Sequence, residues 1–329
     1  MTAKDMFSHR VSILTGHYGT GKTEVSVNLA LALAAEGEQV MLADLDIVNP
    51  YFRSAEQHAL LEAEGIEVFM PSFAMSTVDI PALPAQIQAV FEQPYAHVVI
   101  DVGGDDTGAT ALGRYAPYTR ALRDEMNVLY VVNPCRPFSS SVEDITGLYR
   151  LIERQARLTP DHLVNNANLQ EHTTPEVLLA GQELLKQAAA QLDRQRDFEA
   201  KLKEMHADRP LRALVDTFGC QQNVADSQYI MGMLRAMGCS FTDDPAQADV
   251  VVLNTCAIRD HAEKRVYGNL GALTHTKKAN PAQVICLCGC MAQRPEVAEK
   301  VRQSYRHVDL VFGPQALWKF PELLYQVYT

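Results

Sequence analysis

The chain has 329 residues, of which 47% are hydrophobic and 21% are charged, an ordinary globular composition with length enough for two domains. Its formal net charge is −11, and the 14 basic against 27 acidic side chains of residues 1–200 argue against nucleic-acid binding by that part. Residues 201–329 carry 15 basic and 13 acidic side chains, a balance that leaves RNA binding open there.

The chain has the features of a cytoplasmic protein. No apolar run approaches the roughly 20 residues that span a bilayer, and the N-terminus MTAKDMFSHR lacks the apolar core of a secretory signal. Seven cysteines are present, six of them in the last third of the chain, and cytoplasmic thiols stay reduced. We therefore expect no membrane segment and no disulfide framework, and we expect clustered cysteines to serve a metal or catalysis.

The first predicted element is a buried strand, VSILT, followed by the loop GHYGTGKT. The loop fits the pattern GxxxxGK(S/T), and its glycines Gly16, Gly19 and Gly21 let backbone N–H groups surround a polyphosphate. Lys22 can reach the outer phosphates, and the hydroxyl of Thr23 can bind Mg²⁺. The stretch EVSVNLALALAAEG predicts a helix after the loop, and the N-terminus of such a helix favours anions. The sequence therefore predicts a nucleotide-binding site here.

Acidic side chains lie at the ends of the next two predicted strands. QVMLADLDIVNPY ends in Asp44 and Asp46, and HVVIDV carries Asp101 near its end. Carboxylates at such strand ends handle Mg²⁺ and the attacking water in P-loop enzymes, although acids there can also serve only to cap turns. NVLYVVNP and HLVNNANL supply two more strands. Strands that alternate with helices predict a parallel sheet covered by helices.

Residues 8–190 resemble the ParA/MinD/Mrp-like branch of the P-loop ATPases. The resemblance rests on the loop, on the DxD of Asp44 and Asp46, and on DVGG at Asp101. It implies that this part binds ATP with Mg²⁺. By the same resemblance Asp46 orients the attacking water, and Asp101 supports Mg²⁺ through water, beside the hydroxyl of Thr23.

The resemblance also assigns contact with the base to Asn165 or Asn166, on a late strand, with Asn166 taken as the candidate. Two features depart from this branch. Its signature lysine near the start of the loop is replaced by His17, which questions the dimer-dependent catalysis that this lysine serves. After TTPEVLLAGQELLKQAAAQL the expected final strand is missing, so we expect a sheet without that strand and weaker nucleotide binding.

A charged stretch without glycine, AQLDRQRDFEAKLKEMHAD, predicts an exposed helical connector at residues 191–210. After it RALVDTF, ADVVVLNTC, AQVICLCGC and VDLVFG predict strands that alternate with helices. This alternation predicts a second, smaller α/β domain. The expected fold class is thus α/β with two parallel-sheet domains, a P-loop NTPase domain at residues 1–190 and a second domain at residues 211–329.

Cys220, Cys256 and Cys290 each follow a predicted strand of the second domain. The C-termini of parallel strands share one edge of the sheet, so three loops can bring these sulfurs together. Three thiolates suit an iron–sulfur cluster with one iron left open, because full ligation takes four cysteines. They also suit zinc with His261 or His275 as the fourth ligand.

Packing is the alternative explanation for each of these cysteines. A free cysteine often behaves as a small core hydrophobe, which suits Cys239 and Cys286, whereas Cys288 fits either description. One loop cysteine by itself does not distinguish packing from ligation. Three cysteines at equivalent strand ends favour ligation.

The segments TFGCQQNVADS, LNTCAIRDHAEKRVYGNLG and CGCMAQR, in this order, resemble the N-terminal domain of the radical-SAM tRNA methylthiotransferases of the MiaB type. The resemblance covers residues 211–329. That family adds a methylthio group to isopentenyladenosine beside the anticodon. The resemblance implies that Cys220, Cys256 and Cys290 hold an auxiliary 4Fe–4S cluster whose open iron accepts the sulfur to be transferred.

Asn223, Arg259 and Glu263 also match family positions near that cluster. The sequence has no CxxxCxxC motif, which in the family holds the cluster that cleaves S-adenosylmethionine, and it has no RNA-binding tail domain. We therefore expect a fusion that was cut short or a misjoined reading frame. The resemblance implies that tRNA is a partner of this chain. It implies S-adenosylmethionine as a cofactor only if a radical-SAM domain is supplied elsewhere.

Three functions remain open from the sequence. The first is a tRNA methylthiotransferase-like protein that contributes the auxiliary cluster and carries an ATP-binding domain. The second is an ATP-dependent iron–sulfur carrier, an interpretation weakened by the lack of a CxxC in the P-loop part. The third is a P-loop ATPase regulator whose C-terminal domain is an interaction module with a structural zinc.

Overall fold

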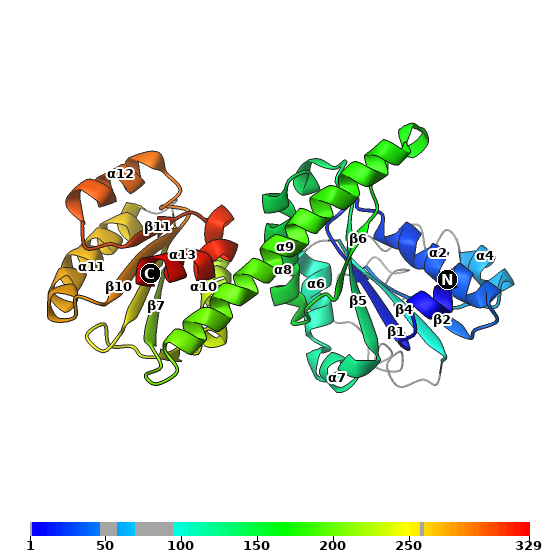
Figure 1. Cartoon of the computed structure of the whole chain (residues 1–329), viewed down its shortest axis with the longest axis horizontal. Helices are drawn as coiled ribbons and strands as arrows, with labels where there is room; N and C mark the ends of the chain where they lie inside the picture. Colours follow the sequence, from blue (N-terminus) through cyan, green and yellow to red (C-terminus); the bar gives the residue numbers. More distant parts are fainter. Residues whose placement is uncertain (1, 47–57, 70–94, 105, 257–259) are drawn as a thin grey trace. The chain divides into compact units, whose positions relative to one another are not determined.

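The strands and helices separate into two compact units, Met1–Ala190 and Gln191–Thr329, which we call unit 1 and unit 2 (Figure 1). The computed structural model describes residues 2–46, 58–69, 95–104, 106–256 and 260–329. All described strand pairs are parallel, which confirms the predicted fold class of two parallel-sheet α/β domains. No helix among the described residues is long and apolar enough to cross a membrane.

Unit 1 is built on a six-stranded sheet with the order β3-β2-β4-β1-β5-β6. Its strands are β1 (Val11–Thr15), β2 (Val40–Leu45), β3 (Glu67–Phe69), β4 (His97–Val102), β5 (Met126–Val132) and β6 (His162–Asn165). Its helices are α1 (Ala3–Met6), α2 (Lys22–Ala35), α4 (His58–Ala63), α6 (Asp106–Gly113), α7 (Ala116–Ala121), α8 (Val142–Ala156) and the first part of α9 (Pro175–Met205), with short 3₁₀ turns η2 (Arg123–Glu125), η3 (Pro137–Ser139) and η4 (Gln170–His172).

The central strands of unit 1 are buried along their whole length, as their near-continuous apolar runs predict for a parallel sheet with helices on both faces. On one face, Val27 and Leu33 of α2 pack against Leu14 and Leu42. On the other face, Tyr130 of β5 meets Tyr149 of α8 with ring centroids 5.4 Å apart. Successive residues of a strand point to opposite faces, so one strand serves both layers.

One edge strand of unit 1 differs from the sequence prediction, and the other edge agrees with it. β3 has three residues, too few for a recognisable apolar run, and was not predicted. β6 lies at the opposite edge, and the described chain beyond it adds no strand to this sheet, as expected for a sheet without the final strand.

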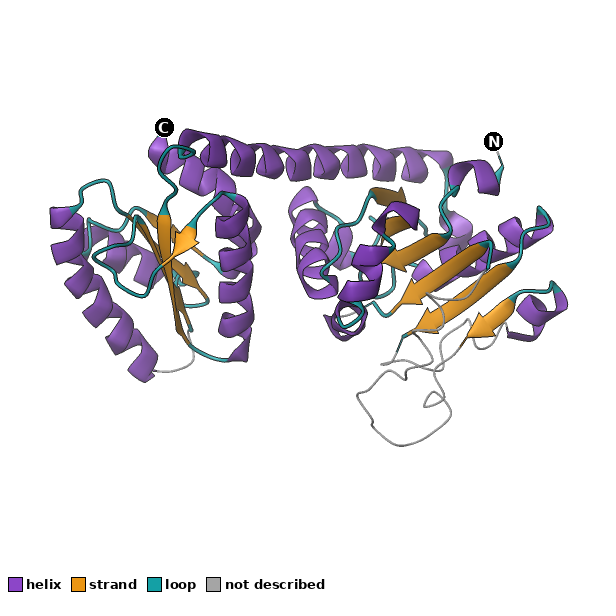
Figure 2. Cartoon of the chain, turned by 90° about the horizontal axis from the view of Figure 1, so that it is seen from below, coloured by secondary structure: helices purple, strands orange, loops and turns teal. Residues whose placement is uncertain are grey.

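Unit 2 has a five-stranded sheet with the order β11-β10-β9-β7-β8 (Figure 2). Its strands are β7 (Arg212–Phe218), β8 (Ser240–Phe241), β9 (Val250–Thr255), β10 (Val284–Gly289) and β11 (Leu310–Phe312). Its helices are the end of α9, α10 (Gln221–Ala236), α11 (Asp260–Ala279), α12 (Pro295–Ser304) and α13 (Phe320–Tyr328), with the 3₁₀ turn η5 (Pro314–Lys319). The two-residue strand β8 was not predicted from the sequence.

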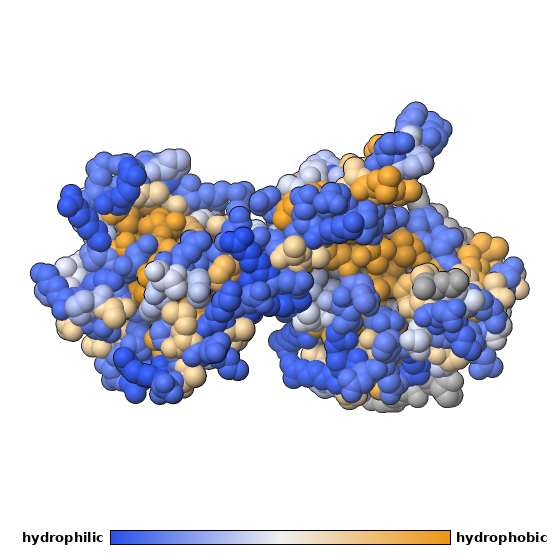
Figure 3. All heavy atoms as spheres, in the orientation of Figure 1, coloured by the Kyte–Doolittle hydropathy of each residue, from blue (hydrophilic) through white to orange (hydrophobic). Residues whose placement is uncertain are grey.

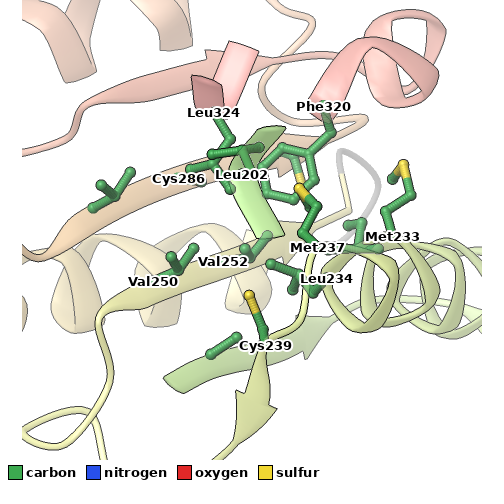
Figure 4. Packing of buried hydrophobic residues seen from close by; sticks show 14 of the residues in the cluster. Leu202, Met233, Leu234, Met237, Cys239, Val250, Val252, Cys286, Phe320 and Leu324 are labelled. Atoms are coloured by element: carbon green, nitrogen blue, oxygen red, sulfur yellow. The ribbon is translucent and has the colours of Figure 1, made fainter. Parts of the chain in front are cut away.

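The strands of unit 2 divide their side chains between two cores. Residues such as Val250, Val252 and Cys286 pack against α10, α13 and the end of α9 (Figure 4). Their neighbours in sequence, such as Val251 and Ile285, pack against α11 and α12 on the other face. This alternation is the two-residue period of a strand, and it leaves the strand ends free to carry other chemistry.

Helix α9 runs without interruption for 31 residues. The sequence predicts an exposed helical connector at residues 191–210. This prediction is wrong in part, because the side chains of Leu192, Gln195 and Leu202 are buried. Leu202 belongs to the core of unit 2. The end of α9 is therefore a structural element of unit 2. The surface in view is mostly hydrophilic, with apolar atoms gathered in patches on each unit (Figure 3). Among the exposed apolar side chains is Leu179 of α9, which is 69% exposed.

Candidate nucleotide and iron–sulfur sites

The phosphate-binding loop joins β1 to α2, and two of its glycines lie where a side chain would not fit. Gly16 has φ +148, and a Cβ on it would lie 2.3 Å from the carbonyl oxygen of Val131. Gly21 has φ +83, and a Cβ on it would lie 2.3 Å from Nδ2 of Asn166. Positive φ values suit glycine and few other residues. The loop is therefore held close to β5 and to the end of β6.

Lys22 lies over this loop. Its side chain is buried and its Nζ donates a hydrogen bond to the carbonyl oxygen of His17, at 3.1 Å. Gly104, after β4, lies so close that a Cβ on it would be 2.6 Å from that Nζ and 2.8 Å from Cα of Tyr18. The ammonium group thus lies within the loop that would surround a polyphosphate, the position that phosphate binding requires.

Thr23 and Asp101 form the second part of the site. The Thr23 hydroxyl donates to Oδ2 of Asp101 at 2.6 Å, whereas Oδ1 of Asp101 is buried without a hydrogen-bond partner among the described residues. Burial, and then the charge of Asp44, raise the pKa of Asp101 to about 7, against the opposing effect of Lys22. A buried carboxylate oxygen without a partner, beside a threonine hydroxyl, fits the oxygen ligands that Mg²⁺ prefers.

Asp46 follows β2 at the mouth of the same pocket. Its backbone N–H donates to Oδ1 of Asp44 at 2.9 Å, and its side chain lines the pocket together with Lys22 and Thr23. A Cβ on Gly103 would lie 3.1 Å from Oδ1 of Asp46, so the carboxylate lies against the loop that follows β4. The side chains that the sequence predicted for nucleotide and Mg²⁺ are therefore gathered at one edge of the sheet.

The structure distinguishes between the two asparagines at the end of β6. Asn166 lines the pocket and its Nδ2 donates to the carbonyl oxygen of Thr20 at 2.7 Å. Asn165 instead donates to the carbonyl oxygen of Leu178 in α9, at 2.8 Å. Only Asn166 thus faces the nucleotide pocket, and its contact with a base remains a prediction.

The pocket has a volume of about 280 Å³ and is also lined by residues that the sequence motifs do not predict. Asn133 follows β5, is buried, and accepts hydrogen bonds from the N–H groups of Cys135 and Asn168. Arg136 and Gln170 also line the pocket. The polar stretch NPCR directly after a buried strand was the signal that could have indicated Asn133 and Arg136, because ligands gather beyond strand C-termini.

In unit 2 the strand register brings three cysteine loops to one level of the sheet edge. The last residue of β9, Thr255, is paired with Phe218 of β7 and with Gly289 of β10. Cys256 and Cys290 follow one residue after these positions and Cys220 follows two residues after its strand. The three cysteines therefore lie side by side on neighbouring loops, although up to 70 positions separate them in sequence.

The three thiols lie close enough to interact. Burial raises the pKa of Cys290, and the neighbouring Cys256, Asp226 and Cys220 raise it further. No group of three or more histidine, cysteine, aspartate or glutamate side chains within the described ranges is arranged to hold a metal ion. A cluster of several irons is wider than one ion and is held by thiolates. Cysteine is the residue type that holds iron–sulfur clusters, so the type of donor fits such a cluster.

The zinc alternative loses one of its two candidate ligands. His275 lies 15 residues beyond the start of α11, which at 1.5 Å per residue is roughly 22 Å along the helix, whereas Cys256 precedes that helix. His275 therefore cannot join the three thiols. The side chains of His261 and Glu263, and all of Arg259, lie outside the described residues.

The other cysteines of unit 2 are buried in its core, as expected for Cys239 and Cys286. Cys288, left open by the sequence, is also buried, on the face of β10 that packs against α10 and α13. Burial raises the pKa of Cys239 to about 11 and raises those of Cys286 and Cys288 further. Neutral thiols packed in this way are poor metal ligands, because the thiolate is the ligand form.

Two family models match separate parts of the chain. Residues 6–73 match the family described as "NUBPL iron-transfer P-loop NTPase", and residues 212–313 match the "Uncharacterized protein family UPF0004", which corresponds to the N-terminal domain of the MiaB type. Both predicted resemblances are thereby confirmed for these segments.

Curated relatives carry the name tRNA-2-methylthio-N(6)-dimethylallyladenosine synthase. The relative from Alkaliphilus oremlandii is 44% identical over 133 residues, which are 40% of this chain and 28% of that protein. The relative from Clostridioides difficile is 50% identical over 108 residues, which are 33% and 23% of the two chains. The chain thus spans about a quarter of the length of these relatives.

Comparison with solved structures gives matches that cover about half of the chain. The BceF tyrosine kinase domain is 25% identical, with a TM-score of 0.31, over 50% of this chain and 71% of that one. A nucleotide-binding protein from Archaeoglobus fulgidus in complex with ADP is 17% identical, with a TM-score of 0.31, over 50% and 68% of the two chains.

Proposed function

We propose that unit 2 holds an auxiliary 4Fe–4S cluster of a tRNA methylthiotransferase through Cys220, Cys256 and Cys290. The observation that carries this proposal is the register of Phe218, Thr255 and Gly289, because it places the three cysteine loops at one level of the sheet edge. The identity with named tRNA-2-methylthio-N(6)-dimethylallyladenosine synthases over this segment supports the same function.

The residues of unit 2 contribute binding and positioning to this function. When bound, the cluster would supply an iron with an open coordination position, because three cysteines leave one of four positions without a protein ligand. Cys256 is 3% exposed whereas Cys290 is partly exposed, so the site has a buried side and a side open to a reactant. By family resemblance that reactant is the sulfur transferred to tRNA, with a radical-SAM domain as partner.

We propose in addition that unit 1 binds ATP with Mg²⁺. Gly16, Gly19 and Gly21 would surround the phosphates, Lys22 would neutralise the outer ones, and Thr23 would hold Mg²⁺, as the loop motif requires. Asp101 would support the ion through water, Asp46 would orient the attacking water, and Asn166 would contact the base. The proposed domains are residues 1–190 and 211–329, and the connector at 191–210 packs with the second of them through Leu202.

A second function is favoured by one observation. Unit 1 matches a family of iron-transfer P-loop NTPases, and the same chain has three cysteines at one sheet edge in unit 2. The chain would then be an ATP-dependent carrier that releases its cluster to an acceptor protein. Cluster transfer to an apo-ferredoxin, measured with and without Mg-ATP, distinguishes the two: a carrier transfers faster with ATP, and a fixed auxiliary cluster does not transfer.

Reconstitution with iron and sulfide under anaerobic conditions tests the cluster. We expect about four irons per chain and a thiolate-to-iron charge-transfer absorption. Cys220→Ser, Cys256→Ser and Cys290→Ser should each lose that absorption. The matched controls are Cys135→Ser in unit 1 and Cys239→Ala in the unit 2 core, which should keep it. Retention of the full iron content by all three ligand variants would refute the ligand assignment.

Calorimetric titration with Mg-ATP tests unit 1. Lys22→Ala should abolish binding, since the side chain provides the positive charge inside the loop. Gln170→Ala, at the pocket wall, is the control that should alter affinity without abolishing it. If Lys22→Ala binds Mg-ATP as the wild type does, the nucleotide site is not at this loop.

A further inference from the structure

Asn223 lies beneath the predicted cluster site and is fully buried. Its Oδ1 accepts hydrogen bonds from the backbone N–H of Cys220 at 3.2 Å and from the Cys220 thiol at 3.4 Å. Its Nδ2 donates to Oδ1 of Asn254 at 3.1 Å and to the carbonyl oxygen of Thr255 at 3.2 Å. One amide side chain thus joins the loop of Cys220 to the strand that ends at Cys256.

These partners allow only one orientation of the Asn223 amide. The carbonyl oxygen of Thr255 can only accept a hydrogen bond and the N–H of Cys220 can only donate one. A flipped amide would place oxygen against the Thr255 carbonyl and nitrogen against the Cys220 N–H, leaving buried polar groups without partners. The amide therefore fixes the position of Cys220 relative to the end of β9.

Asn254 completes a reciprocal pair with Asn223. The Nδ2 of Asn254 donates to the backbone oxygen of Asn223 at 2.8 Å and to Oγ of Ser227 at 3.0 Å. Ser227 in turn accepts from the hydroxyl of Thr217 in β7, at 2.7 Å. Asn254 is also fully buried. Two asparagines thus lock β7, α10 and β9 together immediately below the cysteine loops.

The third cysteine loop, that of Cys290, lies against the same pair through Gly289 and Thr255, and Gly219 brings the Cys220 loop equally close. A Cβ on Gly289, which has φ +95, would lie 2.5 Å from Oδ1 of Asn254. A Cβ on Gly219 would lie 2.2 Å from Oδ1 of Asn223. The hydroxyl of Thr255 donates to the carbonyl oxygen of Cys288 in β10, at 2.8 Å. All three loops therefore lie directly against the asparagine pair.

We infer that Asn223, together with Asn254, is a positioning residue for the iron–sulfur cluster. The inference rests on the proposal that Cys220, Cys256 and Cys290 are its ligands. The amide pair holds the loops of Cys220 and Cys256 at a fixed separation before iron arrives. Groups hydrogen-bonded to a metal ligand set its orientation, and their loss weakens metal retention. Asn223 acts through the backbone N–H of Cys220, because a ligating thiolate has no proton to donate to its Oδ1, and it does not itself bind iron.

Loss of iron to a chelator from the reconstituted full chain tests this role. Asn223→Ala should release iron about tenfold faster than the wild type, or more, and should change the charge-transfer spectrum. The matched control is Gln283→Ala, since Gln283 is equally buried and donates to the carbonyl oxygens of Pro245 and Ala248 at 2.8 and 2.7 Å. Gln283 precedes β10, at the end of the sheet opposite to the cysteines, so this variant should release iron at close to the wild-type rate.

Unfolding of both variants, followed by the fluorescence of Trp318 in unit 2, separates positioning from general stability. The inference is supported if Gln283→Ala loses as much stability as Asn223→Ala but keeps its iron. It is refuted if both variants lose iron in proportion to their stability, or if Asn223→Ala keeps the wild-type spectrum and rate. If the wild type takes up no iron, the proposed ligand set fails, and this inference fails with it.

A second variant covers the case in which Asn223→Ala does not fold. Asn223→Asp keeps an oxygen towards the N–H of Cys220, which is the N-cap of α10, but it removes the donor to the carbonyl oxygen of Thr255. It should be less stable than the wild type because a carboxyl oxygen then faces the Thr255 carbonyl, but it should fold, since the N–H of Cys220 keeps its acceptor, and it should release iron faster than the wild type. Wild-type iron retention by a folded Asn223→Asp would overturn the inference.

Discussion

Replacing Asp101 with asparagine should stabilise unit 1 at neutral pH and weaken its binding of magnesium nucleotide. The carboxyl is 3% exposed at the end of β4. Burial, followed by the charge of Asp44, raises its pKa from 3.8 to about 7. Asparagine has nearly the same shape without the charge, and its oxygen can still accept the hydrogen bond that the Thr23 hydroxyl donates.

The magnitude follows from linkage between proton binding and folding. The folded-state pKa of Asp101 lies above the unfolded value, so its contribution to stability is fully present below pH 3.8 and is lost as the pH rises to about 7. The shift is about three pKa units, and at about 1.4 kcal/mol per unit it corresponds to about 4 kcal/mol. At pH 8, Asp101→Asn should therefore exceed the wild type in the free energy of unfolding of unit 1 by about that amount, and the difference should vanish near pH 4.

Urea unfolding of the full chain at pH 4, 6 and 8 measures this effect. The single tryptophan of the chain is Trp318, which is buried in unit 2, so its fluorescence reports unit 2 while far-ultraviolet circular dichroism reports both units. The variant should shift only the transition seen by circular dichroism. Saturating Mg-ATP should stabilise the wild type, by about 2.7 kcal/mol at 100 times the dissociation constant, and should have little effect on Asp101→Asn.

Two results would contradict this reasoning. Equal free energies of unfolding of the two proteins at pH 8 would show that burial does not destabilise the charged form of Asp101 in the folded chain. Equal stabilisation of both proteins by Mg-ATP would show that Asp101 does not support the ion.

Other substitutions test the packing around the two sites. Gly104→Ala should lower ATP affinity about tenfold or more, because its Cβ would lie 2.8 Å from backbone of the phosphate-binding loop and 2.6 Å from Nζ of Lys22; unchanged calorimetric affinity would contradict this. A Cβ on Gly19 would meet no atom within 4 Å, but Gly19 has φ +74. Gly19→Ala should therefore lower the free energy of unfolding of unit 1 by about 1 kcal/mol, measured by urea unfolding. An unchanged free energy of unfolding would contradict a left-handed backbone conformation at this position. Glu322→Ala removes the acceptor of the buried Gln195 side chain, at 2.8 Å, and should destabilise unit 2 by about 1–3 kcal/mol when followed by tryptophan fluorescence; an unshifted midpoint would show that α13 is not held by this contact.

The carboxylates of unit 1 show how much of the nucleotide site the sequence could predict. Asp44, Asp46 and Asp101 were selected because they follow apolar runs, and the structure places all three around the phosphate-binding loop. Parallel strands end at one edge, so a strand-end position is enough to predict proximity. The roles of these residues in catalysis stay predictions, because proximity does not by itself establish chemistry.

Asn133 and the end of α9 show what sequence patterns did not predict. Asn133 is a single polar residue after a strand, and its role as the acceptor for two backbone N–H groups depends on a turn that folds back on it. The residues 191–205 have a charged composition typical of an exposed helix, yet Leu192, Gln195 and Leu202 are buried. Burial depends on which neighbouring element covers a helix face, and local composition does not contain that information.

Contiguous residues are enough to predict the phosphate-binding loop and the parallel α/β class, because these depend on a glycine-rich loop between a strand and a helix and on apolar runs of strand length. Only the tertiary structure decided that Asn166 rather than Asn165 faces the nucleotide pocket, and that Phe218, Thr255 and Gly289 lie level with one another. The register of strands far apart in the chain is set by pairing and packing across the sheet. That register, together with the buried amides of Asn223 and Asn254, turns three separate cysteines into one candidate site.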